Sequence, residues 1–169
     1  MALATFFPLL PRLVFIAGLV SAVVPDIDSV AVWLGAEYAG MFGRRGFTHS
    51  PFFALTWATA VASLLRSRTP LTAQRSAWLY LFSATASHGI FDSMSDAGLG
   101  VAFFAPFSAE RYFLPFRPIR TLHASPSGSL ARAAEIMRSE AEWVWAPSVA
   151  VALVVVCIGE LRPKSTRSR

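Results

Sequence analysis

Four apolar segments set the strongest limit on how this chain of 169 residues can fold. They cover residues 6–24, 51–65, 77–91 and 144–161, and charged residues make up only 15% of the chain, against roughly 25% in an average soluble domain. A helix that crosses a bilayer needs about 20 apolar residues, so the two central segments are short for a span. The pattern predicts an all-α, integral membrane helical bundle of about four apolar helices.

Two further stretches are expected at the membrane surface. Residues 97–120 combine aromatic, proline and arginine residues, which suit the interface between hydrocarbon and water. Residues 128–143 have a helix-forming composition with mixed charges, which is typical of a surface helix. The expected organisation is one membrane-embedded helical domain at 1–161, with these interfacial and surface helices, and a basic cytoplasmic tail at 162–169.

The net charge of +5 comes from basic residues that gather beside apolar segments. Seven of the fifteen lie in residues 66–75 and 162–169, directly after apolar runs. Such residues hold helix ends on the cytoplasmic side, although the arginines at 44, 45 and between 111 and 138 would then face outward, against this rule. We therefore expect a multi-pass protein of the inner (plasma) membrane, with the lipid bilayer as its partner and no nucleic acid. The oligomeric state is not indicated.

Ionisable residues at the ends of the apolar segments predict a shared polar site. They occur in three signatures, PDID at 25–28, RRGFTHS at 44–50 and SHGIFD at 87–92. A carboxylate or imidazole beside hydrocarbon is costly unless it is paired or bound to a metal. With the basic stretches 66–75 and 162–169 in the cytoplasm, all of these residues lie on the outer side of the membrane. We predict a metal site formed by Asp26, Asp28, His49, His88 and Asp92.

The ligand chemistry favours Zn or Mn over Ca or Mg, because nitrogen and oxygen donors are mixed. His88 and Asp92 are four residues apart and share a helical face, which Asp96 joins if the helix continues. Each signature also has a structural interpretation. Asp28 would cap the next helix, the commoner role for such a residue in isolation, and His49 would form a hydrogen bond near a helix start. The His88–Asp92 pair would close a helix end.

A metal at this position makes hydrolysis the natural chemistry, because a bound water loses a proton near neutral pH. Asp28 or Asp96 would act as the general base. Arginines in the same loops would hold an anionic group such as phosphate. These arginines are Arg44, Arg45 and Arg117, with Arg111 and Arg120 as further candidates. An equally weighted alternative is that they snorkel toward lipid headgroups.

The three signatures and their surroundings resemble the YdjM-like family of inner-membrane-associated, predicted metal-dependent hydrolases. The likeness includes LPRLVFIAGLVSAVVPDID, FGRRGFTHSPFFAL, ATASHGIFDSMSDAGLGVAFFAPFSAERYFLPFRPI and SEAEWVWAP, and it covers most of residues 10–150. It implies an α-helical membrane protein with a hydrolase site. The same five His and Asp residues would be its metal ligands.

Two departures from the family pattern bear on activity. No histidine precedes His49, where the family has an N-terminal Thr-His, and Arg44 stands where the family's HRG motif has a histidine. Losing two imidazoles would reduce a multi-metal site to one metal or abolish activity. The leading hypothesis is a membrane-bound metal-dependent hydrolase of a phosphoester or lipid-like substrate. The alternative is a non-catalytic membrane scaffold or interaction protein with a structural His/Asp cluster, which the cation at position 44 favours. A transporter is disfavoured, because polar groups are absent from the middle of the segments and no internal repeat occurs.

Overall fold

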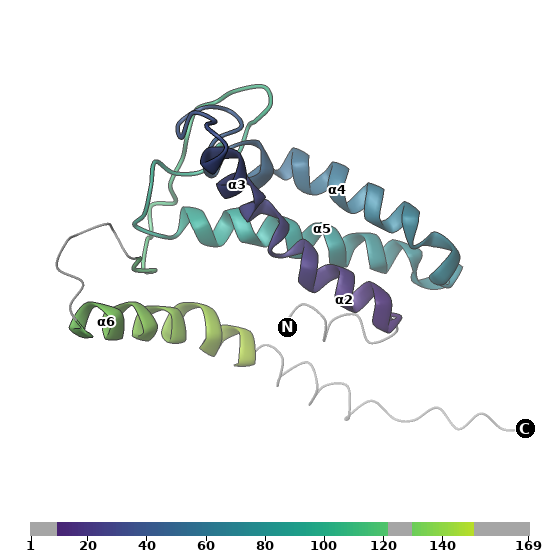
Figure 1. The fold of residues 1–169 in the computed structure, drawn as a ribbon. Coiled ribbons are helices and arrows are strands. Elements are labelled where there is room, and N and C mark those ends of the chain that lie inside the picture. The colour runs from purple at the N-terminus through teal and green to yellow at the C-terminus, as the bar shows by residue number, and fades with distance from the viewer. Residues whose placement is uncertain (1–9, 122–129, 151–169) are drawn as a thin grey trace, which may run out of the picture.

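Three helices pack side by side at the centre of the molecule (Figure 1). The computed structural model describes residues 10–121 and 130–150, with side chains from 133 onward in the second range. Helices α4 (Pro51–Leu64) and α5 (Leu71–Ser93) form an antiparallel pair joined by the 3₁₀ turn η3 (Arg66–Arg68). Helix α2 (Arg12–Ser21) packs against α5. The described residues contain no β-strand, which confirms the all-α prediction for this part of the chain.

Shorter elements lie at one end of the central helices. They are the 3₁₀ turn η1 (Val24–Ile27), helix α3 (Asp28–Trp33) and the 3₁₀ turn η2 (Phe47–His49). The long segment 94–121 is closed on itself by two isolated bridges, Ser95 with Ile119 and Val101 with Tyr112. It is held against this end by hydrogen bonds such as that from the Ala102 amide to the Arg45 carbonyl at 3.0 Å. Helix α6 (Leu130–Glu140), followed by a π-helical turn (Ala141–Trp145), lies apart from the central helices and contacts this segment. A surface helix was predicted over 128–143, and α6 agrees with that prediction.

The boundaries of the two long helices follow local backbone chemistry. Ser50 Oγ accepts a hydrogen bond from the amide of Phe53 at 3.1 Å, and Pro51 occupies the first helical position, as predicted. Helix α5 is longer than the apolar segment 77–91 because the residues after Pro70 also favour a helix despite their polarity. It ends at Ser93, so Asp96 lies beyond it and does not share the face of His88.

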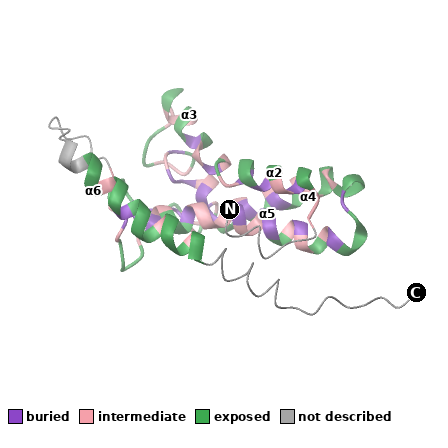
Figure 2. Cartoon of the chain, turned by 90° about the horizontal axis from the view of Figure 1, so that it is seen from below, coloured by how far each residue is buried: buried purple, intermediate pink, exposed green. Residues whose placement is uncertain are grey.

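The core is formed where α2 crosses α5. Val14, Ala77 and Tyr80 are its buried residues. A Cβ atom at Gly18 would collide with the Tyr80 ring, so glycine is required for this close approach. Trp57 Nε1 donates to Ser21 Oγ at 3.0 Å and ties α4 to the end of α2. Buried residues gather between these helices, and exposed ones cover their outer faces (Figure 2).

Large apolar side chains cover much of the surface. Trp33 is 83% exposed, Phe107 82% and Leu34 74%, a pattern typical of contact with a membrane or a partner. No single described helix is both long and apolar enough to cross a bilayer, but α2 and the stretch Val24–Trp33 meet the criterion together, with a 46° bend between them. The predicted last span at 144–161 and the tail at 162–169 lie mostly or wholly outside the described residues.

Candidate functional site

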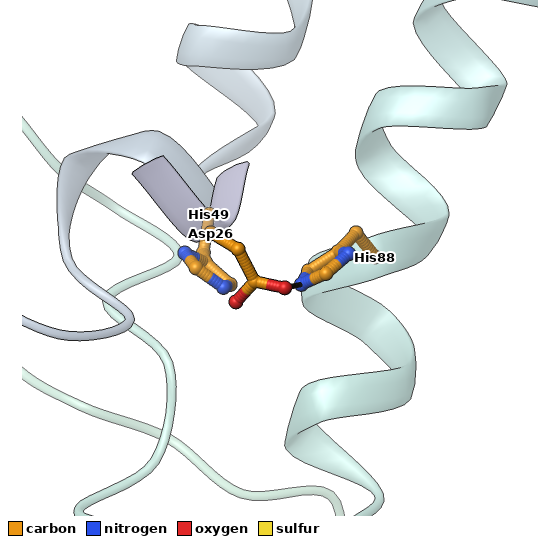
Figure 3. A group of neighbouring side chains, drawn as sticks. All are labelled: Asp26, His49 and His88. Atoms are coloured by element: carbon orange, nitrogen blue, oxygen red, sulfur yellow. Dashed lines mark ion pairs between the residues drawn. The ribbon is translucent and has the colours of Figure 1, made fainter. Parts of the chain in front are cut away.

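The end of the bundle that carries the short elements brings the three sequence signatures together. The chain turns at Pro25 after α2, which places Asp26 in η1 and Asp28 at the first position of α3. His49 ends η2, and His88 belongs to the last part of α5. Figure 3 shows the Asp26 carboxylate directed toward His88, with His49 beside it. These three residues offer ligand atoms that all lie within 4.8 Å of one another.

A glycine makes this convergence possible. A Cβ atom built on Gly89 would lie 2.4 Å from the carbonyl oxygen of His49. The backbone of η2 therefore rests directly on α5, one residue after His88. No larger residue fits at this position unless η2 moves.

Hydrogen bonds to the Nδ1 atoms fix the orientation of both imidazoles. His88 Nδ1 lies 2.8 Å from the carbonyl oxygen of Ala22, which can only accept, so Nδ1 carries the proton. His49 Nδ1 lies 3.0 Å from Asp28 Oδ2 and 3.2 Å from Thr48 Oγ1. In both residues the Nε2 atom is then left to face the centre of the cluster. Metal-binding histidines in proteins are commonly held in this way.

The inward-facing ring nitrogens lack hydrogen-bond partners among the described residues. His49 Nε2 and His88 Nε2 are both buried without one, whereas Asp92 Oδ2, which they face, pairs with Arg45 Nε at 2.8 Å. The His49 Nε2 and His88 Nε2 atoms lie 3.2 and 4.0 Å from Asp92 Oδ2, and His88 Nε2 lies 3.5 Å from Asp26 Oδ2. Unpaired buried polar atoms are rare in folded proteins. Here they converge on one point from separate elements.

Asp28 lies behind the cluster and is saturated with hydrogen bonds. Its Oδ2 atom accepts from the Arg45 amide at 2.7 Å and from Thr48 Oγ1 at 3.2 Å, besides facing His49. Its Oδ1 atom accepts from Arg44 at 2.8 Å. The side chain is 2% exposed. Asp28 does not cap α3, because the residue before the helix, Ile27, occupies the cap position and no side chain caps it. The capping interpretation is wrong for this residue.

Arg44 lies outside the ring of imidazoles. Its Nη1 atom is 2.6 Å from Asp26 Oδ1, 2.8 Å from Asp28 Oδ1 and 2.7 Å from Ser29 Oγ. The histidines face the Oδ2 atoms of the same two aspartates. The arginine and the imidazoles therefore use opposite oxygens of each carboxylate.

Arg45 closes the other side of the cluster. Its Nε atom lies 2.8 Å from Asp92 Oδ2, and its Nη1 atom donates to the Ala97 carbonyl at 2.6 Å and to Ser95 Oγ at 3.1 Å. The residue is 7% exposed and has a positive φ of 56°, a conformation that costs energy for a residue other than glycine. Its surroundings therefore determine its position closely.

The charges around His49 and Asp92 perturb both groups. Burial alone would lower the pKa of His49, but hydrogen bonding and charge from Asp28 and Asp92 outweigh it, so the pKa is raised. Burial alone would raise the pKa of Asp92, but the hydrogen bond to His49 and the charges of Arg45 and both histidines lower it. The ionised pair is thus favoured in the folded protein.

The remaining predicted residues lie elsewhere. Asp96 accepts hydrogen bonds from the amide and hydroxyl of Thr121, at 2.9 and 2.8 Å, and pairs with Arg120 at 3.4 Å. The exposed Arg117 stacks over the Phe113 ring at 4.7 Å. None of them contacts the cluster through a described interaction.

Arg111 supports the loop that carries the two cluster arginines. It donates to the backbone carbonyl of Arg44 at 2.6 Å and to those of Ala39 and Gly40 at 3.1 and 2.9 Å. Its Nη1 and Nη2 atoms are engaged by backbone carbonyls, and its Nε atom is buried without a hydrogen-bond partner among the described residues. Sequence reasoning missed this role, together with those of Thr48 and Gly89. For Thr48 and Gly89 the only signal was their position inside the signatures, and for Arg111 there was none.

Comparison with known proteins agrees with the resemblance noted above. The model of the family described as YdjM inner membrane protein matches residues 1–163. The inner membrane protein YbcI of Escherichia coli (strain K12) is 33% identical over 145 residues, which cover 82% of this chain and 80% of that protein. No solved structure matches the chain. These findings confirm the prediction of an inner membrane protein.

Proposed function

The chain belongs to the YdjM inner membrane protein family, and on that premise we propose that it is a membrane-bound metal-dependent hydrolase. Its substrate would be a phosphoester or a lipid-like molecule. One divalent ion, Zn or Mn, would be held by His49, His88, Asp26 and Asp92. The observation that carries this proposal is that the buried Nε2 atoms of His49 and His88, without hydrogen-bond partners among the described residues, converge with the Asp26 carboxylate within 4.8 Å.

The donor set fits such an ion. Metal–ligand bonds of about 2.0–2.1 Å put neighbouring ligand atoms of a tetrahedral site about 3.3 Å apart. The separations here are 3.2 Å from His49 Nε2 to Asp92 Oδ2, 3.5 Å from His88 Nε2 to Asp26 Oδ2 and 4.0 Å from His88 Nε2 to Asp92 Oδ2. Two imidazoles and two carboxylates suit Zn or Mn better than Ca or Mg. Asp26, His49 and His88 offer ligand atoms within 4.8 Å of one another, and Asp92 would join them as the fourth ligand.

Each residue of the cluster has a separate role in this proposal. When bound, the ion acts as a Lewis acid toward water and toward a phosphoryl oxygen. Asp28, with both oxygens engaged, orients His49 instead of acting as a base. Asp26 is the most exposed carboxylate of the cluster, at 39% of its side chain, so it is the ligand on the side from which a substrate would enter. Asp96 takes no part.

Arg44 is compatible with one ion, because it contacts the Oδ1 atom of Asp26 and leaves Oδ2 toward His88. Its side chain is 27% exposed, which leaves it able to attract an anionic substrate. The absence of an imidazole at position 44 argues for a single metal.

A non-catalytic structural cluster is the second candidate, and one observation favours it. The charges of Asp26, Asp28 and Asp92 are balanced within the cluster by two arginines, which contact them at 2.6–2.8 Å, and by His49 when it is protonated. Such a set can hold the ends of the helices together without a metal. The raised pKa of His49 agrees with this arrangement as well as with a metal site.

The deciding experiment is the metal content of detergent-purified protein grown with Zn and Mn. The parent is compared with His88→Ala/Asp92→Ala, which removes two ligands, and with Asp96→Ala, a matched control that removes a carboxylate outside the cluster. About one equivalent of metal in the parent and the control, and none in the double variant, supports the metalloenzyme and justifies a phosphoesterase screen. Folded protein without metal in all three would establish the structural cluster instead.

A further inference from the structure

A groove beside the cluster is lined almost entirely by hydrocarbon. It has a volume of about 590 Å³ and forms where the chain bends between α2 and η1. Its lining residues are Leu19, Val20, Val23, Val24, Asp26 and Ile27. The single polar group among them is the carboxylate of Asp26.

That carboxylate also belongs to the proposed metal site. Asp26 Oδ2 lies 3.5 Å from His88 Nε2, so the residue at the polar end of the groove is shared with the cluster. The other walls are open to the outside, with Val20 57% and Val23 64% exposed. In an inner membrane protein, exposed aliphatic side chains of this kind meet the hydrocarbon of the bilayer.

We propose that this groove seats an acyl chain of a bilayer phospholipid whose phosphate lies at the His/Asp cluster. The inference rests on the proposed function and names its substrate class. The shape matches an amphiphile, because hydrocarbon walls end at one charged corner. Arg44, which contacts Asp26 from the other side at 2.6 Å, adds a guanidinium for the phosphate.

The groove contributes by fixing the position of the lipid headgroup. Lipid tails are as apolar as valine and leucine side chains, so moving a chain from the bilayer into the groove gains little hydrophobic free energy. A chain held along Val20 and Val23 does, however, fix the position of the phosphate relative to Asp26 and His88. Placing a reacting group in this way is a large part of catalysis.

The test compares alkyl phosphates of different chain length on Co²⁺-loaded protein in maltoside micelles, with the Co²⁺ absorption spectrum as readout. Val20→Phe/Val23→Phe fills the groove. Ile16→Phe is the matched control, because Ile16 is 54% exposed on the same helix and does not line the groove. Partition of the ligand into micelles is the same for both variants and cancels in the comparison.

Because a chain seated in the groove holds the phosphate close to the ion, we expect the groove-filling variant to bind dodecyl phosphate about 10-fold more weakly than the control does, and ethyl phosphate equally well. Equal binding of dodecyl phosphate by both variants overturns the inference and leaves the metal site intact, since the face is then ordinary lipid-facing surface. No uptake of Co²⁺ by the parent overturns the metal site and the inference together.

Discussion

His49 Nε2 lies 3.2 Å from Asp92 Oδ2, an oxygen that Arg45 Nε also approaches to 2.8 Å. His49 Nδ1 faces Asp28, so a neutral imidazole would direct its Nε2 lone pair at a carboxylate oxygen. That arrangement is repulsive unless a proton or a metal ion lies between the two atoms. The cluster thus provides a cation position that a proton and a metal ion would compete for.

Metal binding should therefore release a proton from His49. The pKa of this residue is raised by Asp28 and Asp92, so the metal-free protein retains the proton to a higher pH than a free imidazole does, and the metal displaces that proton. Titration calorimetry with Zn²⁺ in two buffers of different ionisation enthalpy should show release of about one proton at pH 6–7. The affinity should rise with pH up to the raised pKa and then level off. Binding without proton release would contradict this account.

The stability of the metal-free protein should be greatest between the two titrations of the pair. His49 has a raised pKa in the folded state, so its stabilisation is complete below its ordinary value, near 6.5, and is lost as the pH rises through the raised value. Asp92 has a lowered pKa, so its stabilisation is complete above its ordinary value, near 3.9, and is lost as the pH falls. Thermal unfolding between pH 3 and 9 checks this.

A control for the pH profile is the Asp92→Asn variant. It removes the group that titrates at acid pH and one of the two partners that raise the pKa of His49. Both flanks of the profile should then become shallower. An unchanged profile would mean that other groups dominate the pH dependence.

Asp28→Asn should weaken metal binding without unfolding the protein. The amide keeps the size of the carboxylate but loses the charge that orients and polarises His49 from 3.0 Å. Losing such a partner costs about 10- to 100-fold in metal affinity. Competition with a chromogenic chelator measures it, and Asp96→Asn is the matched control. If Asp28 were itself a ligand, the loss would be nearly complete.

How much of the cluster can be predicted from sequence depends on how far apart along the chain the interacting residues lie. Asp26, His49, His88 and Asp92 stand at the ends of apolar segments, and a bundle with short loops must bring such ends together. The partners of the two arginines could not be predicted in the same way. Whether Arg44 contacts the Oδ1 or the Oδ2 atoms of Asp26 and Asp28 depends on the left-handed backbone conformation at Arg45. It also depends on the backbone carbonyls to which Arg111 donates.

The end of α5 shows the same limit in helix prediction. The spacing of His88 and Asp92 gave the correct face, but Asp96 depended on where the helix stops. Met94 leaves the helix, and Asp96 turns toward Thr121, which is 25 residues further along the chain. Such a distant contact leaves no local signal. The start at Leu71 did have one, because Pro70 directly precedes it.

Gly89→Ala should separate the two histidines. The new methyl group would meet the His49 carbonyl oxygen at 2.4 Å and push η2 away from α5. Overpacking of this kind costs about 1–3 kcal/mol of unfolding free energy, and metal content should fall with it. Ser87→Ala is the matched control on the same helix, because its hydroxyl bonds only to the helix backbone. Unchanged metal content and stability in Gly89→Ala would show that η2 does not rest on α5 as described.

Arg44→Gln distinguishes a metal site from a self-neutralised cluster. The arginine places a positive charge 2.6 Å from Asp26 and 2.8 Å from Asp28, and this charge opposes a second cation nearby. Removing it should tighten divalent metal binding by about tenfold, or ~1.4 kcal/mol, at the effective dielectric of a half-buried site. The metal-free variant should be less stable than the parent, because two carboxylates lose their counter-ion. Arg117→Gln removes the same charge far from the cluster and should change neither quantity. Weaker metal binding in Arg44→Gln would instead mean that the arginine acts chiefly by holding Asp26 in position, and lower stability with no metal in either protein would establish the purely structural cluster.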